Sequence, residues 1–340
     1  MVVFSQKIES PTIPGRFSYD ILVIDECSTV SNKDMKQILD KVETKLLVLV
    51  GDTFQIESIR FGNWFSIIRD FVDDDSVLQL ETPYRTNNEN LLTVWNRVRE
   101  LDEAILELIV KHGYSVPLDN SILNTPNDDE IILCLNYDGI YGINNLNKFL
   151  QGINQNQPVY WGVNTYKIDD PILFNEVERF SPLIHNNMKG RIVNVEKLYD
   201  EIYFSIALDV AINEIEAIGY DFELLPSQEN GNSVIKFKVS KHPGSDEDGD
   251  YSDAIVPFQI AYAVSIHKAQ GLEYKSVKIV ITNDVEDMIT HNIFYTAITR
   301  AREDLKIYWT PETEKSVFDS FTKKNFSKDV KFLKSLKDST

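Results

Sequence analysis

The chain has 340 residues, of which 43% are hydrophobic and 26% are charged, and its formal net charge is −19 at pH 7. This length and composition predict a globular protein of two or three domains with buried cores. The charge excludes a passive nucleic-acid coat, which needs a broad basic face to neutralise phosphates, but it allows a cleft that is locally basic.

The first part of the chain alternates between strand and helix patterns. Apolar runs predict strands at 21–24, 46–50 and 77–80. A helical pattern covers 32–42, and the spacing of apolar residues predicts one long helix over 87–111. Such alternation is typical of a parallel sheet covered by helices. The polar stretch 112–129, which contains Gly113 and two prolines, predicts a domain junction.

A second α/β unit is predicted to begin with a strand at 131–135 and a helix at 142–150. Its other strands are expected much later, at 260–265, 277–281 and 305–309. Between them, short runs separated by polar turns predict a small inserted β-barrel, with strands at 172–174, 191–195, 203–208 and 234–239. The predicted boundaries are 1–112 for an incomplete first domain, 128–165 with 255–312 for the second, 166–254 for the insertion, and 313–340 for a basic C-terminal helix.

Asp25 and Glu26 directly follow the apolar run at 21–24. This pattern predicts a core strand that delivers two carboxylates to the carboxyl edge of a parallel sheet, where ligands bind in open α/β folds. Taken alone, the pair also fits a solvated strand end or a helix cap. Four further motifs follow in order: Gly51-Asp-Thr-Phe-Gln55, Pro83-Tyr-Arg85, Ser265-Ile-His-Lys-Ala-Gln-Gly-Leu-Glu273 and Tyr295-Thr-Ala-Ile-Thr-Arg-Ala-Arg302.

The order and spacing of these motifs resemble motifs II to VI of superfamily 1 DNA helicases, and RecD-like helicases most closely, from about residue 20 to about residue 310. The resemblance implies an α/β fold with two RecA-like parallel sheets of the P-loop NTPase type and an SH3-like barrel as the insertion. It implies ATP and Mg²⁺ as cofactors and single-stranded DNA as the partner. The implied activity is ATP-driven translocation along the strand.

The resemblance also gives roles to the first two motifs. Asp25 is expected to bind magnesium through water, and carboxylates suit this task because magnesium prefers oxygen ligands. Glu26 is the expected base that activates the attacking water. Gln55 is expected to bond a γ-phosphate oxygen or that water, with Asp52 beside it at the strand end. A polar turn after a core strand is the alternative for the Asp52 motif.

Arg85 and Arg300 match the arginines that approach the γ-phosphate in this family. A guanidinium suits the role because it is always charged and offers a bidentate fork. Arg302 also fits a surface or structural arginine.

The resemblance implies that the Ser265 motif contacts both the nucleic acid and the nucleotide. The resemblance places Ser265, His267 and Gln270 toward nucleic acid, and Gly271 with Glu273 near the nucleotide ribose. Taken alone, His267 fits a structural histidine better, and the surrounding motif favours the functional role. Aromatic side chains can stack on unpaired bases, and Trp64 follows the second motif where the family places base contacts. Packing in the core of an amphipathic helix is the alternative for Trp64.

One expected motif is missing. A phosphate-binding loop needs Gly-x-x-x-x-Gly-Lys followed by Ser or Thr, and none of the 14 glycines is followed by lysine. We therefore expect a truncated product or fragment whose missing partner is the Walker A segment of the parent helicase, and which alone hydrolyses ATP poorly or not at all. Two other functions remain open: a non-catalytic nucleic-acid-binding or protein-docking remnant, and a superfamily 1 ATPase acting on RNA.

The location is inferred from composition. Cys27 and Cys134 lie in apolar contexts and predict reduced core residues of a cytoplasmic protein. No apolar run approaches the roughly 20 residues of a membrane span, so no membrane association is expected. We expect a monomer. The C-terminal lysines fit a solubilising helix face or, as the alternative, a nucleic-acid contact.

Overall fold

The computed structural model describes residues 2–3, 16–58, 60–80, 84–124, 129–175, 177–226, 231–241, 254–322 and 324–337. The acidic run at 246–250 lies outside these residues. The chain forms two compact units, each with its own sheets and core. Unit 1 comprises 1–115, 283–305 and 310–340, and unit 2 comprises 116–282 and 306–309.

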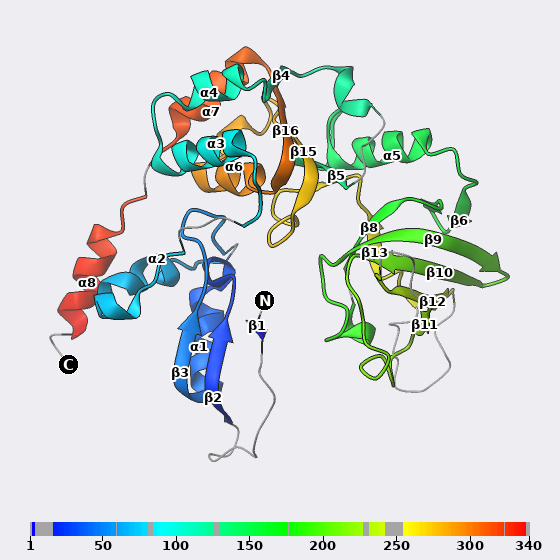
Figure 1. Cartoon of the computed structure of the whole chain (residues 1–340), viewed down its shortest axis with the longest axis horizontal. Helices are drawn as coiled ribbons and strands as arrows, with labels where there is room; N and C mark the ends of the chain where they lie inside the picture. Colours follow the sequence, from blue (N-terminus) through cyan, green and yellow to red (C-terminus); the bar gives the residue numbers. More distant parts are fainter. Residues whose placement is uncertain are drawn as a thin grey trace. The chain divides into compact units, whose positions relative to one another are not determined.

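Unit 1 contains a small sheet with the order β1-β2-β3. Strands β2 (Phe17–Ile24) and β3 (Val42–Leu49) run parallel, and β1 (Val2–Val3) pairs antiparallel with β2. Helix α1 (Asn32–Lys41) connects β2 to β3 and lies along them (Figure 1). Ser31 is the N-cap residue just before the helix, and its side chain accepts a hydrogen bond from the backbone of Asp34.

Apolar side chains hold α1 to this sheet. Leu22, Ile24 and Met35 are buried in one cluster, and Leu47 and Leu49 pack against it. The expected parallel β-α-β arrangement at the start of the chain is therefore confirmed. Unit 1 also contains helices α2 (Trp64–Ile68), α3 (Glu89–Glu100), α4 (Ile105–Lys111), α6 (His291–Ile298), α7 (Pro311–Ser320) and α8 (Ser327–Lys337).

The prediction of one helix over 87–111 is wrong. The helix is broken after Glu100 because Leu101 adopts a left-handed backbone with φ 57° and caps α3. The side chain of Asp102 then accepts a hydrogen bond from Ala104 N at 2.8 Å, and α4 starts just beyond. Both helices bury apolar residues at helical spacing. The helical pattern in the sequence therefore continues through the break after Glu100 and does not show where the first helix ends.

The predicted strand at 77–80 is also wrong. These residues form no strand, and Leu78 and Leu80 are 91% and 87% exposed. A short apolar run becomes a strand only where a neighbouring strand offers backbone partners. Among the sheets of the described residues, no strand pairs with this run.

Unit 2 contains most of a five-stranded sheet with the order β14-β5-β15-β16-β4. Its strands are β4 (Ser115–Pro117), β5 (Glu130–Cys134), β14 (Ala263–Ser265), β15 (Tyr274–Val280) and β16 (Ala301–Trp309). Both β14 and β15 run parallel to β5. Helix α5 (Ile143–Ile153) packs on this sheet through Leu146 and Leu150. The predicted sharing of one parallel sheet by β5 and β14 is confirmed.

The strand expected at 260–265 is divided between two sheets. Residues Phe258–Ile260 form β13, which pairs antiparallel with β8 (Pro171–Phe174), whereas β14 joins the parallel sheet. The apolar run is continuous in the sequence, and its pattern does not show where the chain changes sheets.

The segment expected to be β-rich forms a six-stranded antiparallel sheet with the order β11-β12-β10-β9-β8-β13. Its remaining strands are β9 (Lys189–Leu198), β10 (Glu201–Leu208), β11 (Glu223–Leu225) and β12 (Val234–Ser240). A hairpin of β6 (Val159–Trp161) and β7 (Asn164–Tyr166) precedes it. The core contains Phe174, Phe180 and Phe204, all fully buried. An SH3-like barrel remains a prediction.

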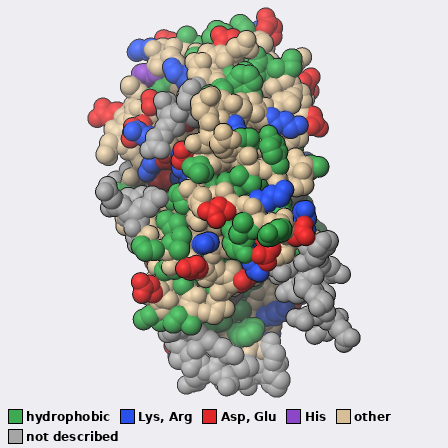
Figure 2. All heavy atoms as spheres, turned by 90° about the vertical axis from the view of Figure 1, so that its right-hand side faces the viewer, with side chains coloured by type: hydrophobic (Ala, Val, Ile, Leu, Met, Phe, Trp, Pro, Cys, Tyr) green, Lys and Arg blue, Asp and Glu red, His purple; other side chains and the backbone are tan. Residues whose placement is uncertain are grey.

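On the molecular face drawn in Figure 2, lysine and arginine side chains lie between acidic and hydrophobic ones. Positive charge is therefore dispersed over that face and not gathered in one block. No helix among the residues that the structure describes is long and apolar enough to span a membrane.

Candidate functional site

The ends of β2 and β3 place the carboxylates side by side in unit 1. Val50 N donates to Ile24 O at 2.8 Å, and Cys27 N donates to Val50 O at 2.8 Å. The segments that follow β2 and β3 therefore stay hydrogen-bonded beyond the last strand residues. Asp25 and Glu26 leave the sheet at this edge, and Gly51 and Asp52 leave it from the neighbouring strand.

Glu26 holds an unusual backbone. Its φ of 52° and ψ of 40° lie in the left-handed region, which residues with a Cβ seldom occupy. Asp25 stabilises this turn because its Oδ1 accepts a hydrogen bond from Glu26 N at 2.8 Å. Backbone strain of this kind costs about 1–3 kcal/mol and tends to occur at functional sites.

The motif at residues 51–55 forms a tight polar turn. Asp52 Oδ1 accepts from Phe54 N at 2.9 Å, and Gln55 Nε2 lies 3.5 Å from Asp52 Oδ2. The Oε1 atom of Gln55 is buried and has no hydrogen-bond partner within the described chain. Buried acceptors are normally satisfied, so this oxygen is suited to receive a proton donor such as a water molecule.

Arg300 is fully buried just beyond helix α6. Its Nε donates to Thr296 O at 3.0 Å, and its Nη2 donates to Thr299 Oγ1 at 3.3 Å. Arg85 donates from Nη1 to Thr299 O at 2.9 Å. One turn at the end of α6 therefore holds both guanidinium groups that the sequence singled out.

The charges in unit 1 act on one another. Burial and then the neighbouring Arg85 lower the pKa of Arg300 to about 10, while Glu26 and Asp52 act to raise it. Arg300 therefore stays charged at neutral pH. Burial, reinforced by Asp52, raises the pKa of Tyr295 to about 12, so its hydroxyl stays protonated. Glu26, Asp52 and the two arginines thus share one electrostatic environment.

The donor set fits a magnesium ion carried by a nucleotide. Within the described residues, no group of three or more His, Cys, Asp or Glu side chains is arranged to hold a metal ion alone. Magnesium is commonly bound through one or two carboxylates together with substrate phosphates and waters. Asp25 and Asp52 offer such carboxylates at adjoining strand ends.

The second group of predicted residues follows β14 in unit 2. Ser265 is buried, and its Oγ accepts from Lys268 N at 3.3 Å, which closes a turn at the carboxyl end of the strand. His267 and Gln270 are partly exposed in this turn, and burial lowers the pKa of His267. Gly271 has a φ of 76°, which suits glycine.

Glu273 lies just before β15 and is partly exposed. Its carbonyl accepts from Lys189 Nζ at 3.1 Å, and the same ammonium pairs with Asp129 at 3.0 Å. The structure thus places the residues from Ser265 to Glu273 in one connection from the carboxyl end of β14 to the amino end of β15, with Ser265 at the carboxyl edge of the parallel sheet and Glu273 at its amino edge. It does so within unit 2, whereas the carboxylates and arginines described above belong to unit 1.

Trp64 lies at the start of α2 in a partly buried position. Its Nε1 donates to Val30 O at 2.7 Å, and the ring packs against the α1 core and contacts Phe65. These contacts favour the packing interpretation of Trp64. Phe61 is 78% exposed in the same region, so it is the more accessible aromatic ring.

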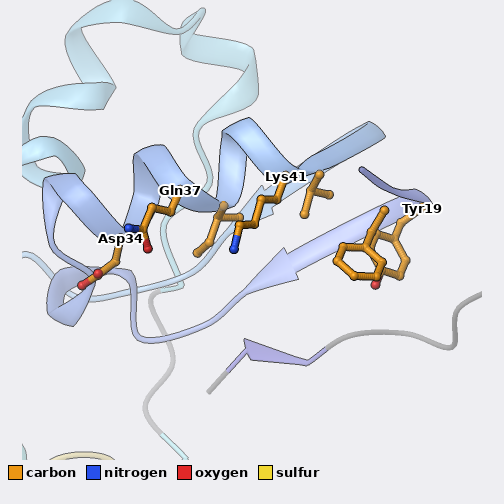
Figure 3. A pocket seen from close by; sticks show the side chains of 7 residues that line it. Tyr19, Asp34, Gln37 and Lys41 are labelled. Carbon is orange, nitrogen blue, oxygen red and sulfur yellow. The ribbon is translucent and has the colours of Figure 1, made fainter. Parts of the chain in front are cut away.

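A hollow of 440 Å³ lies elsewhere on unit 1, between α1 and the amino end of β2 (Figure 3). Phe17, Tyr19 and Lys41 are among the residues that line it. Asp25 follows the other end of this strand from Phe17 and Tyr19, and none of Asp25, Glu26 and Asp52 lines the hollow. The hollow is therefore separate from the strand-end carboxylates.

Sequence reasoning gave no role to Asn292 or Thr296. Both are buried on α6, and both bond the backbone of the turn that carries Gln55. The available signal was a pair of polar residues four positions apart in a helix whose positions after His291 are otherwise mainly apolar, which predicts one shared polar face.

Two family matches cover separate parts of the chain. Residues 12–115 match the family described as AAA domain, and residues 260–308 match the UvrD-like helicase C-terminal domain. The chain is also 21% identical over 325 residues to the RecBCD enzyme subunit RecD of Mycolicibacterium smegmatis, covering 86% of this chain and 50% of that protein. Over most of its length, the chain is similar to superfamily 1 helicases of the RecD and Pif1 type.

This helicase-like chain has further relatives. It is 25% identical over 328 residues to the ATP-dependent DNA helicase Pif1 of Campylobacter jejuni, covering 86% of this chain and 70% of that protein. The helicase-like chain spans about half the length of its RecD relative. The match over 12–115 covers the segment that carries the first three predicted motifs, and the match over 260–308 covers the segment that carries the last two.

Solved helicase structures share the fold. Pif1 helicase from Bacteroides in complex with ADP-AlF3 and ssDNA aligns with a TM-score of 0.52 at 14% identity, covering 94% of this chain and 76% of that one. Pif1 helicase from Candida albicans aligns with a TM-score of 0.52 at 15% identity, covering 94% and 77%. The α/β fold with parallel sheets is therefore that of known helicase structures.

Proposed function

We propose that the chain forms the nucleotide-hydrolysing and DNA-contacting part of an ATP-dependent, RecD-like DNA helicase. The observation that carries this proposal is the environment shared by Glu26, Asp52, Arg85 and Arg300 in unit 1. Two carboxylates and two guanidinium groups are the side chains needed to activate water and to neutralise charge on a transferring phosphoryl group.

Each residue then has a defined task. Glu26 takes a proton from the attacking water, and the unpartnered Oε1 of Gln55 accepts a hydrogen bond that orients that water. Arg85 and Arg300 stabilise the negative charge that develops on the phosphoryl oxygens. Asp25, with Asp52 beside it at the adjoining strand end, would hold a magnesium ion through water, and the ion would supply charge neutralisation at the phosphates. Gly271 and Glu273 lie beside the ribose.

The nucleic-acid contacts of the turn after β14 lie on unit 2, and the aromatic candidates lie on unit 1. Ser265, His267 and Gln270 contact the strand backbone from the turn after β14, and Phe61 or Trp64 stacks on a base. The similarity to Pif1 structures that contain single-stranded DNA supports this partner. The predicted domain boundaries, the SH3-like character of the six-stranded sheet and a monomeric state belong to the same proposal.

We propose that hydrolysis requires a phosphate-binding loop from polypeptide outside this sequence. None of the 14 glycines is followed by lysine, so the chain lacks the backbone cradle and ammonium group that hold the β- and γ-phosphates. The activity of the 340 residues alone is therefore weak or absent.

The decisive experiment replaces Glu26 with glutamine in a polypeptide that joins these residues to a phosphate-binding loop. Glutamine keeps the shape of the side chain but cannot accept the proton, and loss of a general base typically lowers the rate about 10²–10⁴-fold. Steady-state ATPase rates with single-stranded DNA, and nucleotide affinity by fluorescence, would measure the effect. We expect turnover to be lost and nucleotide binding to remain.

Glu107→Gln is the matched control, because Glu107 is exposed on α4 in the same unit. It should leave turnover unchanged. Near-normal turnover in Glu26→Gln would show that the strand-end carboxylates were assigned wrongly. Stimulation by RNA but not DNA would favour the RNA-acting alternative, and DNA binding without any turnover would favour the non-catalytic one.

A further inference from the structure

Helix α6 is bonded to the turn that carries Gln55, although the two are separated by about 240 residues in the chain. Asn292 Nδ2 donates to Thr53 O at 3.2 Å and to Gln55 O at 2.9 Å. Thr296 Oγ1, one helical turn later, accepts from Ile56 N at 2.8 Å. Asn292 is 7% exposed and Thr296 is fully buried, so water does not compete freely for these bonds.

The same helix holds the arginines. Arg300 Nε donates to the carbonyl of Thr296, and Arg85 Nη1 donates to the carbonyl of Thr299. Thr296 therefore contacts the Gln55 turn through its hydroxyl and Arg300 through its carbonyl. One residue joins the two parts of the site by two hydrogen bonds.

Ring contacts fix the same turn from another side. Phe54 packs edge-on against Tyr295 and His291 of α6, with ring centroids 6.2 and 6.3 Å apart. The guanidinium of Arg99 lies over Phe54 at 4.6 Å from the ring centre. The turn is thus held to α6 by backbone, side-chain and aromatic contacts together.

We propose that Asn292 and Thr296 are positioning residues that fasten the Gln55 turn to the helix carrying Arg300, so that the water-orienting amide and the phosphate-facing guanidinium keep a fixed separation. Neither residue is proposed to contact the nucleotide. This inference rests on the proposed function for its catalytic meaning, whereas the fastening itself is a property of the chain and can be measured without ATP.

The first test measures backbone hydrogen exchange over residues 53–58 in the 340-residue chain. Thr296→Val keeps the shape of the side chain but removes the acceptor for Ile56 N–H, and we expect about tenfold faster exchange there. Thr296→Ser retains the hydroxyl and should restore protection. Thr313→Val is the matched control, because Thr313 is another buried helical threonine of unit 1 whose hydroxyl bonds Thr310.

Unchanged exchange in Thr296→Val would overturn the inference. Equal acceleration in Thr296→Ser or Thr313→Val would also overturn it, because the effect would then be a general loss of stability. Asn292→Asp offers a second variant that cannot donate to the two carbonyl groups, and it too should accelerate exchange in this segment.

The second test measures ATPase kinetics in the polypeptide that includes a phosphate-binding loop. We expect Thr296→Val to lower kcat about tenfold or more, with KM for ATP changed less than about threefold, because nucleotide-binding groups are untouched. An unchanged kcat would contradict the inference. If the unsubstituted protein hydrolyses no ATP, the proposed function fails, and hydrogen exchange alone decides whether the turn is fastened to α6.

Discussion

Arg300 shows how a buried charge can be held ready for a ligand. Removing a guanidinium from water is costly unless hydrogen bonds and opposite charges compensate. Here Thr296 and Thr299 accept hydrogen bonds from Arg300, while Glu26 and Asp52 supply negative charge. The positive charge of the neighbouring Arg85 disfavours the charged form of Arg300. An anionic phosphate placed between the two arginines would reduce this repulsion.

His267 should make the stability of unit 2 depend on pH. Burial lowers its folded-state pKa below the ordinary value of about 6.5, so the unfolded chain binds a proton first as pH falls. This residue therefore removes stability as pH drops below about 6.5 and has no such effect above it. We expect urea midpoints at pH 7.5 and 5.5 to differ less in His267→Gln than in the unsubstituted chain.

His185→Gln, at an exposed histidine of the same unit, is the control for this measurement. An unchanged pH difference in His267→Gln would show that the burial of this ring does not affect protonation.

The residues of the candidate site differ in how far the sequence could predict them. Asp25, Glu26 and Asp52 follow apolar runs, so their position at strand ends could be deduced from local patterns. The roles of Arg85 and Arg300 were predicted from the family resemblance, because no local sequence pattern indicates that these two residues lie close together. Contacts of Asn292 and Thr296 with a turn about 240 residues away depend on tertiary packing, which no sequence window contains.

Elements with a strong local signal were predicted well, and breaks between them were not. Helix α1 and strand β2 combine apolar spacing with a clear start or end. The break at Leu101 required a left-handed leucine, and most residues with a Cβ avoid that conformation. The failed strand at 77–80 shows the same limit, since strand formation depends on a partner supplied by the rest of the fold.

The start of α3 offers a test at the level of a single helix. Asn88 Oδ1 accepts from Asn90 N at 3.1 Å and Leu91 N at 3.3 Å, and its amide donates to Glu303 O at 3.0 Å. Asn88→Ala should lower the free energy of unfolding by about 1–2 kcal/mol, because the cap is lost. Urea denaturation monitored by circular dichroism would measure this.

Asn88→Asp keeps the capping oxygen and should lose less than the alanine variant. Asn90→Ala, at an exposed position in the same helix, should change stability by less than about 0.5 kcal/mol. Equal stability of Asn88→Ala and Asn90→Ala would contradict the capping role.

For the molecule as a whole, the sequence predicted two parallel sheets and a β-rich insertion, and these are present. The compact units follow different boundaries from the predicted domains, because residues 283–305 group with the first 115 residues. Hydrophobic patterns identify elements, but they do not show which distant segments pack together. The domain boundaries given above therefore remain predictions.

The purified 340-residue chain should show no ATP turnover above background, with or without single-stranded DNA. Positioning and electrostatic stabilisation supply nearly all catalysis of phosphoryl transfer, and the Gly-Lys pair of a phosphate-binding loop does not occur in this sequence. A coupled-enzyme ATPase assay would check this, with the loop-containing polypeptide as the positive control. Robust DNA-stimulated turnover that Glu26→Gln abolishes would contradict the expectation.

Unit 1 is built from segments that are far apart in the sequence, and this affects the order in which its contacts can form during synthesis. The six strands of the antiparallel sheet lie between residues 171 and 260, so they can pair as soon as that stretch has left the ribosome. The Gln55 turn, by contrast, has to wait for α6 at residues 291–298 before its hydrogen bonds can form. At typical elongation rates of about 5–20 residues per second, the nascent amino-terminal segment lacks these bonds for ten seconds or more. The part of the candidate site that is synthesised last therefore supplies the hydrogen bonds that hold the part synthesised first.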